Sequence, residues 1–190
     1  RSVKNSRVGT TKKLYEVLRN AKHTVIIDSP YLIMTRELKN IFKSLIKRDV
    51  SIRILTNSLK STDGLFPAAG YLNQRRKIAK MGIDLYEYNS DDSFHSKSFV
   101  IDNEIAIIGS FNLDPRSENL NTETLAIIED DKVASRLTES MNETLDLAYK
   151  IDNRGRPVGF TKRLPGVNLK KKIITRLLQI FITPWARGLL

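Results

Sequence analysis

The stretch Phe94-His-Ser-Lys-Ser-Phe-Val-Ile-Asp102, followed directly by Asn103-Glu-Ile-Ala-Ile-Ile-Gly-Ser-Phe-Asn112, combines two apolar runs with a group of reactive polar side chains. The runs at 96–101 and 104–108 are short and rich in β-branched residues, which predicts two strands. If these strands form a hairpin, the residues after the second strand return beside those at the start of the first. The hairpin would therefore gather the polar side chains at one edge of a sheet.

His95 and Lys97 are two residues apart on the first predicted strand, so we expect their side chains on the same face. Ser110 and Asn112 follow the second strand and would return beside them. Asp102 lies at odd spacing from both His95 and Lys97 and would point to the other face. We therefore expect the Asp102 carboxylate to hold backbone amides of a turn.

These residue types suit an anionic phosphorus centre. An imidazole can attack phosphorus or protonate a leaving oxygen, while lysine and asparagine donors hold the non-bridging oxygens. Glu123 begins the next predicted strand and is placed to accept a hydrogen bond from the imidazole of His95, which would fix its tautomer. The chemistry requires no metal and no cofactor.

Outside this stretch the chain alternates helical and strand patterns. Further strands are predicted at 24–28, 50–55, 83–88 and 122–129, and helices from residue 10 and at 35–48, 66–81 and about 131–150. Alternation of this kind indicates an α/β fold, with a mixed, mostly parallel sheet flanked by helices. We expect a catalytic domain over residues 1–150 and a basic connector with an amphipathic tail over residues 151–190.

The composition excludes several classes of protein. The 190 residues include no cysteine, which removes disulfide frameworks, iron–sulfur clusters and thiol nucleophiles, and only two histidines, which leaves little for a zinc enzyme. The apolar runs are shorter than the ~18–20 residues of a membrane span. The chain begins at Arg1 and its first methionine is Met34, so we expect it to be part of a longer reading frame.

The positive charge is concentrated in the tail. The formal net charge is +11, but residues 151–190 hold nine basic residues and one acidic residue, a net of +8, which leaves +3 for residues 1–150. A strong basic excess usually indicates nucleic acid or an anionic membrane as the partner. A duplex-binding groove requires a basic stripe on the folded body, so this distribution favours the membrane.

The spacing H-x-K-x4-D-x6-G-S-x-N, from His95 to Asn112, resembles the signature of the phospholipase D superfamily. The segments around it resemble the bacterial cardiolipin synthase branch: Asp114-Pro-Arg-Ser117, Leu120-Asn-Thr-Glu123, Ser29-Pro-Tyr31, Thr56-Asn-Ser58 with Thr62-Asp63, and Gly82-Ile-Asp-Leu-Tyr-Glu87. The resemblance covers roughly residues 10–150 and is strongest to the C-terminal half of a two-motif cardiolipin synthase.

The resemblance implies a reaction in which one histidine becomes a phosphohistidine and a second protonates the departing alcohol. By it, His95 is the general acid and then the base in a full two-motif enzyme, and in a homodimer it could serve either role. Lys97, Ser110 and Asn112 hold the phosphate, and Glu123 orients His95. Asp102 belongs to the same motif. Only one such motif is present, so a missing N-terminal half or a second copy must supply the other histidine.

Two classes of function follow. The first is a phosphatidyltransferase that forms cardiolipin from phosphatidylglycerol or a related phospholipid, and the second is a phosphodiesterase or nuclease that acts as a homodimer. A catalytically silent half that completes another subunit is a weaker third reading.

Some polar residues have structural explanations as well. We expect His23, a lone histidine between a helix and a strand, to be structural. It cannot supply the second motif, because no lysine follows it by two residues. Tyr31 and Asp63 fit a pocket lining or a turn and a cap equally well.

The tail from Lys170 combines Lys170-Lys171-Lys172 with an apolar arc at helical spacing that includes Phe181, and Pro184-Trp185 follow. A basic amphipathic helix with an interfacial tryptophan favours an anionic membrane surface over a helix that covers the sheet. This predicts a peripheral protein on the cytoplasmic face of a bacterial inner membrane, with Lys170, Lys171, Lys172, Phe181 and Trp185 in contact with lipid.

Overall fold

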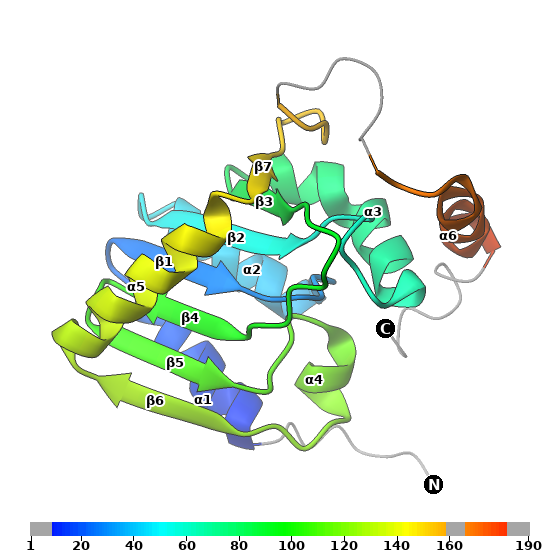
Figure 1. Ribbon diagram of the computed structural model, residues 1–190. Coiled ribbons are helices and arrows are strands. Elements are labelled where there is room, and N and C mark those ends of the chain that lie inside the picture. Colours follow the sequence, from blue (N-terminus) through cyan, green and yellow to red (C-terminus); the bar gives the residue numbers. More distant parts are fainter. Residues whose placement is uncertain (1–8, 159–165, 182–190) are drawn as a thin grey trace, which may run out of the picture.

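A seven-stranded sheet forms the centre of the molecule in the computed structural model, which describes residues 9–158 and 166–181. The strand order is β6-β5-β4-β1-β2-β3-β7, visible edge to edge in Figure 1. The strands are β1 Thr24–Asp28, β2 Ser51–Asn57, β3 Asp84–Tyr88, β4 Ser98–Ile101, β5 Ile105–Gly109, β6 Leu125–Glu129 and β7 Ala148–Lys150.

The sheet is mixed, as the sequence predicts, but it is not mostly parallel. Within the described residues, β1, β2 and β3 pair in parallel, whereas the other four pairings are antiparallel. Parallel neighbours need a crossover, which α2 and α3 provide between the first three strands. No long helix separates β4, β5 and β6, so these strands turn back on one another directly.

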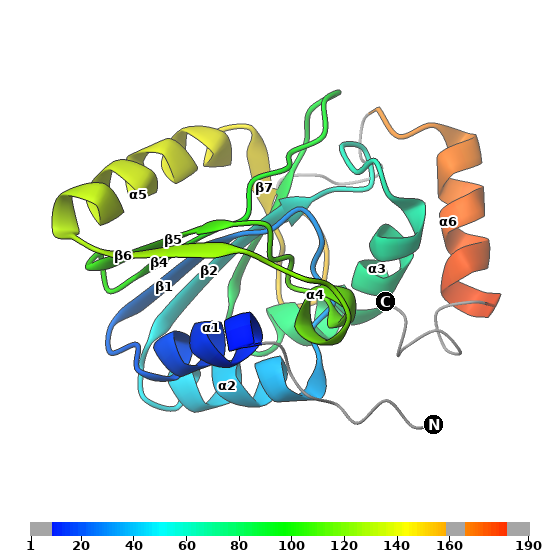
Figure 2. The same cartoon turned by 90° about the horizontal axis from the view of Figure 1, so that it is seen from below.

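Helices cover both faces of the sheet (Figure 2). The helices are α1 Gly9–Arg19, α2 Arg36–Ile46, α3 Leu65–Ala79, α4 Pro115–Asn119, α5 Asp131–Leu145 and α6 Leu169–Phe181. The larger core lies between the sheet and the apolar faces of α1, α2 and α3, while α5 packs on the opposite face in a smaller cluster. Among the described helices, none has the length and apolar character needed to cross a bilayer.

The segment predicted as one helix over 131–150 divides into α5 and the short edge strand β7. Helix α5 ends at Leu145, and β7 pairs antiparallel with β3. Tyr149 on β7 donates to the buried carboxylate of Glu87 at 2.6 Å, as does Tyr71 of α3, also at 2.6 Å. The guanidinium of Arg75 completes this cluster at 2.9 Å. The buried carboxylate therefore fixes β7 and α3 to β3. The contact joins segments that are far apart in the chain, so the local hydrophobic pattern of the sequence does not reveal it.

Candidate active site

Most of the polar residues singled out in the sequence gather at the end of the sheet where β1 and β2 end, whereas Asp102 lies at the opposite end. Strands β4 and β5 form the predicted hairpin, and the pairing extends past β4 because the Gly109 N–H donates to the Lys97 carbonyl at 3.1 Å. This contact sets Ser110 beside Lys97. The hairpin turn lies at the opposite end, where Asp102 and Asn103 both have positive φ values of 55° and 56°.

His95 and Lys97 lie in the segment just before β4, and not on the strand itself as predicted. Asn57, the last residue of β2, holds this segment through both polar atoms of its amide. Its Nδ2 donates to the Phe94 carbonyl at 2.8 Å, and its Oδ1 accepts from the Phe94 N–H at 3.1 Å. The backbone next to His95 is therefore fixed, while the His95 side chain is exposed.

Lys97 is a half-buried cation surrounded by acidic groups. Its Nζ donates to the His95 carbonyl at 2.9 Å. Desolvation lowers the pKa of Lys97, and the carboxylates of Glu123, Asp63 and Asp114 oppose that shift. The Lys97 ammonium group is therefore available to bind a phosphate oxygen, which would lie closer to it than these carboxylates do.

The Glu123 carboxylate contacts hydroxyl and amide groups instead of the predicted imidazole. Its oxygens accept from the hydroxyls of Ser110 and Ser117, the latter at 2.7 Å, and from Nδ2 of Asn121 at 3.1 Å. The prediction that Glu123 orients His95 directly is therefore wrong for this structure. The reason is α4, whose first turn brings Ser117 onto the carboxylate and leaves Glu123 to position Ser110.

Asn112 presents a buried polar group without a partner. Its backbone N–H donates to the Ser117 hydroxyl at 3.2 Å, but its Oδ1 has no hydrogen-bond partner among the described residues. A side-chain amide turned over about its Cβ–Cγ bond presents an NH2 donor at the same position. This position is therefore suited to the oxygen of a ligand.

Gly109 is required by the close approach of β6. A Cβ atom built at this position would lie 2.0 Å from the carbonyl oxygen of Thr124. Ser110 exchanges backbone and side-chain hydrogen bonds with the same residue, at 3.0 Å and 3.1 Å. The glycine thus lets the strand carry Ser110 into contact with the end of β6.

Tyr31 and Asp63 form one wall beside His95. The Tyr31 and His95 rings lie edge to face with centroids 6.3 Å apart, and the Tyr31 hydroxyl donates to Asp63 at 2.8 Å. Burial and this hydrogen bond raise the pKa of Tyr31 to about 12. The Ser29 hydroxyl joins this loop to the segment after β5, donating to the Tyr31 carbonyl at 2.7 Å and accepting from the Leu113 N–H at 3.0 Å.

Asp102 holds backbone amides, as the sequence predicts, and lies away from the other motif residues. Its carboxylate accepts from the N–H groups of Lys22, His23 and Thr24 at 2.8, 2.7 and 2.8 Å. Partial burial disfavours the charged form, but these donors outweigh it and lower the pKa of Asp102. His23 precedes the first residue of β1, and the His95 segment lies at the other end of that strand. A strand of five residues separates the two histidines by roughly 13 Å or more.

The predicted lipid contacts in the tail are divided between two faces of α6. Lys170 and Phe181 are exposed, and Lys172 is half-buried. Lys171, by contrast, donates to backbone carbonyls of the folded body, so it is a docking contact. Trp185 lies outside the described residues.

Sequence reasoning missed the roles of Ser117, Asn57 and Asn121. Ser117 bridges Asn112 and Glu123, and Asn57 holds the backbone that precedes His95. For Asn57 the available signal was a polar residue at the end of a predicted strand. For Ser117 it was the preceding Asp114-Pro115, which is typical of the start of a helix.

The chain matches the family model described as "Cardiolipin synthase, PLD-like domain" over residues 14–145. Cardiolipin synthase C of Escherichia coli is 29% identical over 203 residues, covering 92% of this chain and 43% of the relative. The major cardiolipin synthase of Bacillus subtilis is 30% identical over 136 residues, covering 71% of this chain and 27% of the relative. The chain thus spans less than half the length of these curated relatives.

Solved structures agree with the fold. Phosphatidylserine synthase of Haemophilus influenzae superposes with a TM-score of 0.76 at 15% identity, covering 98% of this chain and 46% of that one. Nuc of Salmonella typhimurium, a phospholipase D family member, superposes with a TM-score of 0.61 at 21% identity, covering 74% of this chain and 90% of that one.

Fold and site together define a phospholipase D-type domain. Within that superfamily, the chain belongs to the cardiolipin synthase family.

Proposed function

We propose that this chain is one catalytic half of a phosphatidyltransferase that makes cardiolipin from phosphatidylglycerol or a related phospholipid through a phosphohistidine. The observation that carries the proposal is the exposed His95 imidazole on a fixed backbone, with the Lys97 ammonium bonded to the His95 carbonyl. The amide oxygen of Asn112, which has no hydrogen-bond partner among the described residues, supports it. The family match supports a phospholipid as the substrate.

The two half-reactions give His95 two roles in turn. A histidine from a second motif attacks phosphorus, the bond from phosphorus to the leaving glycerol oxygen breaks, and His95 donates a proton to that oxygen. His95 then accepts the proton of the incoming alcohol as its oxygen attacks phosphorus and releases the nucleophilic histidine. Lys97 and Asn112 stabilise the negative charge on the non-bridging oxygens in both transition states.

The second histidine must come from elsewhere. In-line displacement puts the nucleophile and the acid on opposite sides of phosphorus, so one imidazole cannot serve both roles at once. His23 is too far along β1 to face His95 across a phosphate. We therefore propose that a second motif, from another half or another copy of the chain, completes the site.

The test is lipid mass spectrometry after the protein, as its full reading frame, is mixed with phosphatidylglycerol vesicles. The variant is His95→Ala, and His23→Ala is a matched control because it makes the same change at the other histidine of the chain. We expect cardiolipin from the wild-type protein and the His23→Ala variant. Loss of a general acid–base should reduce the rate of the His95→Ala variant by about 10² to 10⁴.

Other products would change the assignment. Phosphatidic acid without cardiolipin would identify a hydrolase that uses water as the acceptor and would refute the transferase. Equal turnover by the wild-type and His95→Ala proteins would refute the role of His95. Absence of any lipid product from the folded protein would reject the lipid substrate, and cleavage of DNA would then support the homodimeric nuclease.

A further inference from the structure

Helix α6 attaches to the folded body through its polar edge. Lys171, Thr175 and Gln179 are spaced four residues apart, so they form one stripe along the helix. Lys171 donates from Nζ to the carbonyls of Lys60 and Thr62 at 2.9 and 2.7 Å, and Thr175 is only 1% exposed. Gln179 exchanges hydrogen bonds with Asn73 of α3 at 3.2 Å.

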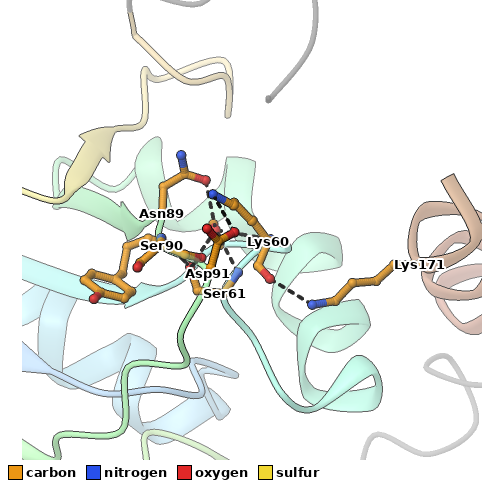
Figure 3. A network of polar contacts seen from close by, with 8 residues as sticks. Lys60, Ser61, Asn89, Ser90, Asp91 and Lys171 are labelled. Atoms are coloured by element: carbon orange, nitrogen blue, oxygen red, sulfur yellow. Dashed lines mark hydrogen bonds and ion pairs between the residues drawn. The ribbon is translucent and has the colours of Figure 1, made fainter. Parts of the chain in front are cut away.

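The loop that receives Lys171 is itself fixed (Figure 3). The Ser61 hydroxyl donates to the Ser90 carbonyl at 3.1 Å and accepts from the Ser90 N–H at 3.0 Å, and Lys60 forms an ion pair with Asp91 at 3.0 Å. The polar stripe of α6 therefore docks on a defined surface, and the orientation of the helix about its axis is determined.

This docking turns the apolar side of α6 outward. Five large apolar residues are at least half exposed: Leu169, Ile173, Leu177, Ile180 and Phe181. At 100° per residue they occupy an arc of about 120° opposite the docked stripe. A helix that served only to cover α3 would bury this arc and expose Lys171 and Thr175.

Cations lie beside and within the exposed arc. Arg176 lies next to the arc on one side, Lys172 lies farther round on that same side, toward Gln179, and Lys170 lies within the arc. The described segment 166–181 contains no acidic residue. An apolar strip with lysine and arginine beside and within it is complementary to a lipid surface with anionic headgroups.

The exposed strip is long, narrow and basic. Thirteen residues of helix are about 20 Å long. A helix that presents such an apolar strip with lysine and arginine beside it, and no acidic residue, has the pattern of helices that lie in a membrane interface. We propose that the outward face of α6 docks the protein on an anionic membrane, with the apolar arc in the headgroup–acyl boundary and the three cations at the headgroups.

The docked helix is next to the candidate active site. Thr62 accepts from Lys171, and the following residue, Asp63, accepts from Tyr31, whose ring packs against His95. Figures 1 and 2 both show α6 alongside α3, at the end of the sheet where α4 also lies. A membrane bound on α6 would thus lie beside the candidate active site. This would help a lipid to reach the site, a consequence that rests on the proposed lipid substrate.

The test is co-sedimentation of the full protein with sucrose-loaded vesicles of phosphatidylcholine, with and without 30% (roughly) phosphatidylglycerol as a cardiolipin-free anionic surface. The variant Ile173→Ser/Leu177→Ser removes the middle of the arc. The control Leu147→Ser/Val158→Ser changes two apolar residues of similar exposure, 57% and 54% against 52% and 50%, away from α6. Thermal melts verify folding, and all four side chains are exposed enough to be replaced with little change in Tm.

We expect binding to the anionic vesicles to fall at least about tenfold in the α6 variant and to stay within about twofold in the control. Lys170→Gln/Lys172→Gln should weaken it by about fivefold for each lysine. Unchanged binding by the α6 variant, equal loss in the control, or no vesicle binding by the wild-type protein would each overturn the proposal. A His95→Ala protein that binds normally but makes no product separates this result from the proposed function, because docking requires no turnover.

Discussion

Replacing Asp102 by asparagine should cost stability and leave the chemical step intact, although this aspartate is part of the sequence motif. In the folded protein Oδ1 accepts from two backbone amides, of His23 and Thr24, and Oδ2 accepts from a third, of Lys22. Asparagine keeps Oδ1 as an acceptor, but its NH2 group replaces Oδ2. That group faces the Lys22 N–H, so two donors meet and this hydrogen bond is lost. It also removes the charge that strengthens all three bonds.

The expected cost follows from these contacts. A hydrogen bond to a charged group contributes about 1.5–3 kcal/mol, but water reaches this site, so we expect a loss of about 1–2 kcal/mol. For a chain of this size that loss corresponds to a fall in Tm of roughly 2–8 °C. Asn tolerates the positive φ of 55° at this position, so the backbone adds little strain.

Asp49→Asn is a matched control for this variant. Asp49 has a similar backbone, with φ of 60°, but its carboxylate holds no backbone amide within the described residues. We expect its Tm to stay within about 1 °C of wild type. Scanning calorimetry gives the Tm values, and lipid turnover is compared 15 °C (roughly) below the lowest of them, where all proteins are folded. The reasoning would be refuted if the Asp102→Asn protein had a normal Tm but a turnover as low as that of the His95→Ala protein.

The same contacts set a pH dependence. The backbone donors lower the pKa of Asp102 below the unfolded value of about 3.9, so ionised Asp102 stabilises the folded state above that pH. This contribution is lost as the pH falls through about 3.9 toward the lower folded pKa. The difference in unfolding free energy between wild type and Asp102→Asn should therefore be larger at pH 7 than at pH 3. A difference that grows on acidification would contradict the assignment.

Three further substitutions test other parts of the structure. Gly109→Ala should give insoluble protein or a Tm lowered by more than 10 °C (about 3 kcal/mol or more), because its Cβ would overlap the Thr124 carbonyl; a normal melt would contradict this. Tyr149→Phe should cost about 1–2 kcal/mol in denaturant unfolding, because the buried Glu87 carboxylate loses one donor; an unchanged midpoint would show that the bond contributes nothing. Difference ultraviolet titration of wild type against Tyr31→Phe should show that Tyr31 ionises only near pH 12, and a value near 10 would refute its burial against Asp63.

The strands and most of the site could be predicted because their signals are local. The runs that became β4 and β5 alternate with polar turns, and the hairpin alone brings Ser110 back beside Lys97. The role of Asp102 in holding backbone amides was also predicted, although His95 and Asp102 lie beyond the two ends of β4 and not on opposite faces of one strand. These inferences need only the geometry of neighbouring residues.

The partner of Glu123 could not be predicted in this way. The sequence offers an imidazole and two hydroxyls as hydrogen-bond donors to its carboxylate. Which of them it contacts depends on α4, a five-residue helix that is too short to show helical periodicity in the sequence. The strand β7 was missed for a similar reason. Three residues after a helix carry no pattern of their own, and the contact that fixes them comes from Glu87, more than 60 residues earlier in the chain.

The orientation of α6 could not be predicted from the helical periodicity of its sequence. The apolar arc was visible in the sequence, but an amphipathic pattern states only that a helix has two faces, and the usual expectation is that the apolar face is covered. Here the polar face is covered, because Lys171 reaches two carbonyls left free by the loop after β2. Partial burial lowers the pKa of Lys171, and the carboxylate of Asp63 opposes that shift. The two carbonyls satisfy the hydrogen-bond donors of the half-buried ammonium group. The loop between Lys60 and Thr62 therefore decides which face of α6 is exposed.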